Sequence, residues 1–231
     1  MSSMIDPDFG EISIRRSALS RSISVRVAPD GRLRASMPPY AGLGSLKRMI
    51  NASRLDIRRL LAEQTSHAPL TDGMTIGKSH TLIVTAGKEL AARLTKSQLE
   101  VTLPPTATLA DTAVDSYLTP FIIKALRQEA KAYLPRRLEY LAAAHGFSYQ
   151  SVRFSHASSR WGSCSSRGTI SLNIALMKLP FELIDYVLYH ELSHLNNMNH
   201  STAFWKQVEL LDPHFREHRR KLKANIPNAY V

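Results

Sequence analysis

The run from His190 to His194 constrains this chain more than any other part of its sequence, because it reads His-Glu-Leu-Ser-His. Two histidines four positions apart lie on one face of an α-helix, so both imidazoles can reach one metal ion. Glu191 lies about 100° further round the helix than His190, which places it beside the metal and outside its ligand set. The pattern predicts a helix that carries a hydrolytic zinc site.

The surrounding residues independently predict a helix that starts near Pro180. Proline suits the first helical position, and Glu182 and Asp185 place negative charge near the positive end of the helix dipole. Apolar residues recur every three or four positions and form a stripe that we expect to be buried. The stripe consists of Ile184, Val187, Leu188, Leu192 and Leu195. One face of this helix therefore packs, and an adjoining face carries the histidines.

His200 is the best candidate for a third metal ligand. Its distance from His194 equals the spacing in the metzincin pattern, in which a glycine ends the helix and lets the third histidine return to the metal. Asn197 occupies the glycine position here. Asparagine tolerates the left-handed conformation, so Asn196, Asn197 and Asn199 predict a left-handed helix cap that turns His200 toward the metal.

The alternative third ligand is a carboxylate from the following helix. Glu209 and Glu217 are available for that role. His214 and His218 are also four positions apart, but basic residues surround them and no acid stands beside the first of them. We expect these two histidines to lie on a solvated basic helix.

Further runs extend this pattern to most of the second half of the chain. They are Arg160-Trp161-Gly162-Ser163-Cys164, Ser171-Leu172-Asn173, Leu179-Pro180, Asp185-Tyr186-Val187 and Asn199-His200-Ser201 with Phe204-Trp205. With them the chain resembles the YgjP-like metal-dependent hydrolases, most densely from about 150 to 213. The resemblance implies an α+β, zincin-like metallopeptidase core, similar to that of SprT-like proteases. It also implies His190, His194 and His200 as metal ligands and Glu191 as the catalytic residue.

Two domains are expected, a β-rich N-terminal module over 1–105 and a zincin-like catalytic domain over 106–231, with Pro104-Pro105 at the boundary. The module is predicted to contain strands at 11–16, 22–28, 31–37, 80–86 and 98–103, a turn at Pro29-Asp30-Gly31, and one basic helix from Ser45 to about Gln64. In the catalytic domain we expect a helical segment over 111–144, interrupted or kinked near Pro120 and Pro135, and strands at 150–156 and 168–174.

The loop at 157–167 lies between the last two predicted strands, beside the metal helix. Gly162 permits a tight backbone there, and Trp161 is expected to pack under the loop. Arg160, His156 and Tyr189 are candidates for binding substrate or stabilising the transition state. Cys164 is the only cysteine, and we interpret it as a small buried side chain.

The composition indicates where the protein is located in the cell and which kinds of partner it can bind. A single cysteine allows no intramolecular disulfide, and the sequence shows neither a signal-peptide pattern nor a long apolar segment, so we expect a cytoplasmic protein without a membrane span. The net charge is +11. This charge favours weak association with anionic partners, including nucleic acid, although no nucleic-acid-binding motif accompanies it. The sequence leaves the oligomeric state open.

Three functions remain open at this stage. The first is a zinc metallopeptidase in which a metal-activated water attacks the substrate and Glu191 acts as the general base. The second is a metal-dependent pyrophosphatase acting on nucleoside triphosphates such as UTP, which the basic surface would suit. The third is a non-catalytic, nucleic-acid-associated module with a structural metal. The carboxylate of Glu191 argues against the third, because a structural site does not need it.

Overall fold

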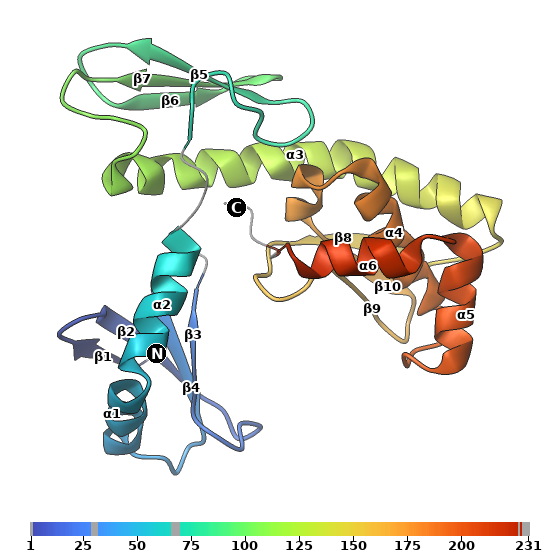
Figure 1. Cartoon of the computed structure of the whole chain (residues 1–231), viewed down its shortest axis with the longest axis horizontal. Coiled ribbons are helices and arrows are strands. Elements are labelled where there is room, and N and C mark those ends of the chain that lie inside the picture. Colours follow the sequence, from blue (N-terminus) through green and yellow to red (C-terminus); the bar gives the residue numbers. More distant parts are fainter. Residues whose placement is uncertain (1, 29–31, 66–69, 226, 228–231) are drawn as a thin grey trace. The chain divides into compact units, whose positions relative to one another are not determined.

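Small sheets and helices alternate along the chain, and the computed structural model describes residues 2–28, 32–65, 70–225 and 227. The chain divides into two units, Met1–Ala68 and Pro69–Val231, whose helices and strands are labelled in Figure 1. Each unit has its own apolar core. The α+β class expected from the sequence is confirmed. Within the described residues, no helix combines the length and apolar character needed to span a membrane.

The first unit is a four-stranded sheet with two helices. Its strands are β1 (Ser2–Asp6), β2 (Gly10–Arg16), β3 (Ser24–Val27) and β4 (Leu33–Met37), in the order β1-β2-β4-β3. Alternate residues of β2 and β4 are buried, as the period of two predicts, and pack with apolar residues of α1 (Leu43–Ala52). The strand β1 was not predicted, because Met4 is its only buried apolar residue. The predicted turn at Pro29-Asp30-Gly31 lies outside the described residues.

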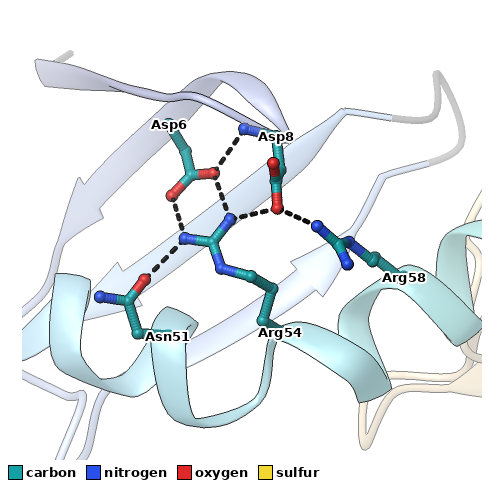
Figure 2. A network of polar contacts seen from close by, with 5 residues as sticks. All are labelled: Asp6, Asp8, Asn51, Arg54 and Arg58. Atoms are coloured by element: carbon teal, nitrogen blue, oxygen red, sulfur yellow. Dashed lines mark hydrogen bonds and ion pairs between the residues drawn. The ribbon is translucent and has the colours of Figure 1, made fainter.

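The single basic helix predicted near 45–64 is wrong, because the structure has two helices, α1 and α2 (Arg54–Thr65), separated at Ser53. Arg54 begins the second helix and reaches the turn after β1 (Figure 2). Its guanidinium donates to Asp6 at 3.0 Å and to Asp8 at 2.6 Å, and also to Asn51 of α1 at 2.6 Å. The interruption therefore lets one arginine join both helices to the sheet, a connection that helical periodicity cannot reveal.

The second unit begins with a sheet that the sequence assigned to the N-terminal module. This sheet contains β5 (Thr81–Ala86), β6 (Ala91–Leu94) and β7 (Gln98–Leu103), in the order β5-β7-β6. Leu82, Leu99 and Val101 are fully buried in the same core as residues of α3 (Thr112–Ala144). The boundary predicted at 105 is therefore wrong, because these strands bury their apolar face on α3 and belong to the second unit.

The helix α3 is continuous, although Pro120 and Pro135 lie inside it. The predicted interruption does not occur. A proline removes the hydrogen bond to the carbonyl four residues earlier, which here belongs to Ser116 and to Lys131. Both of those residues are exposed, so water can satisfy the freed carbonyls. The result is one 33-residue helix that packs on the β5–β7 sheet and on the elements described next (Figure 1).

The remaining elements surround the predicted metal helix. A sheet of β8 (Ser151–Ser155), β9 (Gly162–Cys164) and β10 (Thr169–Asn173) has the order β8-β10-β9, so β9 is an edge strand. The short helix η1 (Ile174–Lys178) leads to α4 (Phe181–Ser193), α5 (Thr202–Leu211) and α6 (Phe215–Lys223). Pro180 is the residue before α4 and not its first helical residue. The strand β9 lies inside the segment predicted to be a loop.

A buried carboxylate joins the loop just before β5 to α3. Glu129 of α3 accepts hydrogen bonds from the backbone N–H groups of Lys78, Ser79 and His80 at 2.6–2.9 Å, and its Oε1 lies 2.7 Å from His80 Nδ1. Burial would raise the pKa of Glu129, but these hydrogen bonds outweigh it and hold the pKa below the ordinary value of 4.5. The ionised carboxylate therefore stabilises the folded unit.

Replacing Glu129 with Gln should destabilise the second unit. The substitution keeps the shape but removes the charge and turns an amide N–H toward backbone donors, so we expect the free energy of unfolding to fall by about 2–4 kcal/mol at neutral pH. Both tryptophans of the chain, Trp161 and Trp205, lie in this unit. Urea unfolding followed by tryptophan fluorescence measures the effect, with the exposed Glu89→Gln as the control.

The sign of the pH dependence follows from the lowered pKa. The stability that Glu129 contributes is complete above its unfolded-state pKa, near the ordinary 4.5, and is lost as the pH falls through the lower folded value. The difference between parent and Glu129→Gln should therefore shrink below about pH 4.5. A difference that stays constant across this range would show that the charge of Glu129 is not what stabilises the fold.

Candidate metal centre

The position of α4 is fixed by its apolar side. Five residues of this side have at most 4% exposure, and they pack in the core of the second unit: Leu183, Ile184, Val187, Leu188 and Leu192. Four of them belong to the stripe predicted from the sequence, and Leu195 beyond the helix is half-buried. With this side buried, His190 in the last turn and His194 at the C-terminal cap project from the adjoining side.

The structure brings three histidines together at the end of α4. One ring nitrogen each of His190, His194 and His200 lies within 4.8 Å of the other two. The Nε2 atoms of His190 and His200 are 3.1 Å apart, and the three ring centroids are 4.8–5.0 Å apart. Three imidazoles at these distances suit a transition metal such as zinc, which takes three protein ligands and one open position in a hydrolytic site.

The orientation of His194 also suits a metal ligand. Its Nδ1 lies 3.1 Å from the backbone oxygen of Asn197. A carbonyl oxygen only accepts, so Nδ1 carries the proton and the lone pair of the neutral ring is on Nε2. A metal-binding histidine commonly has its second ring nitrogen held in this way.

The turn that returns His200 to the cluster differs from the prediction. Among the described residues, only glycines have positive φ, so Asn196, Asn197 and Asn199 do not form a left-handed cap. Asn197 instead uses its backbone oxygen for His194 and donates its side-chain amide to Gln207 of α5 at 2.9 Å. The asparagine matters here for the hydrogen bonds that it makes and not for its tolerance of left-handed backbone.

Aromatic side chains of α5 surround the histidine rings. Ser201 caps α5 by accepting a hydrogen bond from the N–H of Phe204 at 3.4 Å, which starts the helix directly after His200. Phe204 is fully buried, and its ring centroid lies 4.6–4.9 Å from all three histidine rings. The ring of Trp205 stacks on that of His200 at 5.5 Å and 22°. The third histidine is thus positioned by α5.

The surroundings keep the helical histidines neutral. Burial, the neighbouring His194 and His200, and the positive charge of Arg219 all lower the pKa of His190, to about 3. Burial also lowers the pKa of His194. Neutral imidazole is the form that binds metal, so these rings need not lose a proton before binding at neutral pH.

Glu191 is buried between α4 and the edge strand. It is 4% exposed, and its Oε2 has no hydrogen-bond partner in the described part of the chain. Burial raises the pKa of Glu191 to about 8, against the opposing charge of Arg160. A Cβ atom built on Gly162 of β9 would lie 2.5 Å from Oε1 and 2.8 Å from Cδ of Glu191. A larger residue at this position would have to displace the carboxyl group, because that group lies directly against the strand.

Arg160 lies close enough to Glu191 for its charge to act on the carboxyl group. Its side chain is exposed, and its backbone oxygen accepts a hydrogen bond from Asn173 at 2.9 Å. Asn173 is fully buried and also donates to the backbone oxygen of Ala157 at 2.6 Å. One buried amide thus fixes the loop between β8 and β9, and with it the start of the edge strand.

The other two proposed substrate residues lie in different surroundings. Tyr189 faces α3, where its ring lies 5.5 Å from that of His145, and burial together with the charge of Asp185 raises its pKa. His156 is half-buried, and burial and the charge of Arg127 lower its pKa. Within the described residues, no hydrogen bond, ion pair or ring contact joins either side chain to the three histidines.

Cys164 and the alternative carboxylates also have definite surroundings. Burial and the charge of Glu191 raise the pKa of the Cys164 thiol to about 11, so it stays protonated at neutral pH. Glu209 forms an ion pair with Arg216 at 3.1 Å, and Glu217 forms one with Lys221 at 2.9 Å. His218 is not a solvated histidine as predicted, because its Nδ1 lies 2.7 Å from the buried Asp212.

Several residues of the site were not identified from the sequence, among them Trp205 and Arg219. Gly162 was noted only for backbone freedom, whereas its role in the structure is the close approach of Glu191. The residues in contact are 5 to 29 positions apart in the sequence and lie on different elements. The spacing of residues within one helix cannot predict such contacts. The only sign in the sequence that Gly162 matters was its place in the run Arg160–Cys164, which is one of the runs shared with the resembled family.

Three histidines in this arrangement are typical of metal-dependent hydrolases, and a comparison of the sequence with protein families supports this class. The sequence matches the YgjP-like metallopeptidase domain over residues 21–225, most of the chain, so the protein belongs to the YgjP-like family. Among solved structures, the crystal structure of the metallopeptidase zymogen of Pyrococcus abyssi abylysin is 29% identical, with a TM-score of 0.36, and the match covers 41% of this chain and 95% of that chain. No curated protein matches the chain.

Binding of zinc should depend on His200 and stabilise the second unit. A site that binds only the folded chain raises the free energy of unfolding by about 2.7 kcal/mol when free zinc is at 100 times its Kd. His200→Ala removes one of three ligands, so we expect the affinity measured by calorimetry to fall at least about 100-fold. The exposed His214→Ala should keep the parent affinity, and an equal loss in both variants would exclude the three-histidine site.

Gly162→Ala should displace Glu191 without removing a metal ligand. The new methyl group needs the space of the carboxyl group, while core packing holds α4 in place. We expect the zinc affinity to stay within about twofold of that of the parent. The rate of peptide hydrolysis should fall about 100-fold, because a shift of about 1 Å in a reacting group lowers a rate by this much. Gly44→Ala is the control, since its Cβ would meet no atom within 4 Å. Unchanged turnover in Gly162→Ala would contradict the close packing.

Proposed function

We propose that this protein is a zinc-dependent peptidase in which His190, His194 and His200 hold the metal. The observation that carries the proposal is the convergence of three imidazole nitrogens within 4.8 Å, next to a buried glutamate on the same helix. A bound zinc ion would lower the pKa of a water molecule and polarise the bond to be cleaved. The neutral state of the helical histidines and the carbonyl partner of His194 both fit this role.

Glu191 is the proposed general base. It follows a ligand directly in the helix, so it lies beside the ligand set, and its free carboxylate oxygen has lone pairs that no described group uses. Burial alone would keep this carboxyl group protonated at neutral pH, but the positive charge of a bound zinc ion would lower its pKa again. Once ionised, it would take a proton from the attacking water and deliver it to the leaving group. Gly162 limits where the carboxyl group can lie, and the loop fixed by Asn173 places Arg160 within electrostatic reach of it.

The edge strand β9 favours an extended polypeptide as the substrate. It pairs with β10 on one side only, in antiparallel register from Ile170↔Cys164 to Leu172↔Gly162. An edge strand beside a metal helix can pair with the backbone of a bound peptide. Because Gly162 of the same strand touches Glu191, a peptide paired there would lie next to the proposed base.

Glu191→Gln should abolish peptide cleavage and leave zinc binding intact. The amide cannot accept the proton but has nearly the same shape, so we expect turnover to fall at least about 1,000-fold while zinc stoichiometry stays at one. The measurement is cleavage of a mixed peptide library by zinc-loaded protein, with nucleoside triphosphates assayed in parallel and the exposed Glu182→Gln as the control. Loss of zinc in Glu191→Gln would make Glu191 a ligand. Triphosphate hydrolysis without peptide cleavage, lost in the same variant, would replace the peptidase by a nucleotide pyrophosphatase.

A further inference from the structure

Arg219 lies at the aromatic border of the three-histidine cluster. Its guanidinium is 4.4 Å from the ring centroid of Trp205, whose ring stacks on His200 at 5.5 Å and also lies 5.9 Å from His190. One tryptophan therefore contacts both this arginine and two of the proposed ligands. The side chain of Arg219 is exposed, so a molecule in solution can reach it.

The acids nearest to Arg219 along the chain are bound elsewhere. Glu209 pairs with Arg216, Glu217 pairs with Lys221, and Asp212 accepts from His218. Arg219 has no ion pair with any carboxylate in the described part of the chain. Its guanidinium keeps five N–H donors in a planar arrangement, which matches the two oxygens of a carboxylate.

A metal bound by the three histidines would place a second positive charge near Arg219. A divalent metal on these histidines would repel the same guanidinium, since both are positive. Contact with Trp205 attracts the guanidinium, but a neutral side chain could cover the ring without this repulsion. A negatively charged group on the substrate would interact favourably with both cations.

We infer that Arg219 determines specificity by binding a carboxylate of the substrate beside the metal centre. The substrate class is then an acidic peptide, with either a Glu or Asp side chain or a free C-terminal carboxylate close to the cleaved bond. The inference rests on the proposed function for the reaction, but the binding of a carboxylate by Arg219 is measurable without turnover.

The binding experiment uses zinc-loaded protein and pairs of peptide hydroxamates, in which the hydroxamate binds the metal and one of the two adjacent residues is Glu or Gln. For at least one pair, calorimetry should give the parent about tenfold tighter binding of the Glu compound, the range of a charge-assisted hydrogen bond. In Arg219→Gln the Glu-to-Gln affinity ratio should fall to about one. Equal affinities within every pair in the parent would overturn the inference, whatever the turnover.

The turnover experiment compares kcat/KM for Glu and Gln peptides and for peptides with a free or amidated C-terminus. A preference for Glu assigns the carboxylate to a side chain, and a preference for the free C-terminus assigns it to the peptide end. Arg216→Gln, on the same helix, should keep the parent ratio. Arg219→Gln could instead lower kcat/KM equally for both members of each pair, or could lose zinc. Either result would mean that Arg219 only holds Trp205 and His200 in position, and the inference would be wrong. If the parent cleaves no peptide, the proposed function fails while the hydroxamates still test Arg219.

Discussion

Burial of the apolar side of α4 is the interaction on which the candidate site depends. Each fully buried Leu, Ile or Val contributes about 1.5–3 kcal/mol, and five such residues anchor this helix in the core shared with α3 and the surrounding strands. Because successive residues turn by about 100°, fixing the buried side also fixes the directions of His190 and His194. The chemistry of the helix is therefore placed by residues that take no part in it.

The buried carboxyl group of Glu191 lowers the stability that the apolar side of α4 provides. A carboxyl group with one unpartnered oxygen in the interior is costly, and the fold accepts that cost where Gly162 of β9 leaves room for the group. A larger residue at 162 or a polar partner for Oε2 would suit a purely structural core better. An unsatisfied buried group held by a close-fitting backbone is the pattern expected where stability has been given up for function.

Local pattern predicted the helix α4, its buried stripe and the approach of His200 to the two helical histidines, because helical periodicity and ligand spacing are local properties. It did not reveal the role of Gly162 against Glu191, or the chain of contacts from Arg219 through Trp205 to His200, because these depend on how separate elements pack. The same reason explains the domain boundary. The β5–β7 strands look like the strands before them, and only their burial on α3 assigns them to the second unit. The short strands β6 and β9, of four and three residues, are at or below the shortest length at which alternation is informative.

The three histidines come from two differently anchored segments, so a metal bound by all three would also connect those segments. His190 and His194 are held by the core packing of α4, whereas His200 is positioned by the start of α5, through Ser201, Phe204 and Trp205. Between the two segments, Asn197 bonds to both His194 and Gln207. The Nε2 atoms of His190 and His200 lie 3.1 Å apart, and a hydrogen bond between them uses the lone pair of only one of the two rings. A cation bound there would interact with every lone pair at once and would tie α5 to α4, so metal binding and the ordering of the site are expected to be coupled.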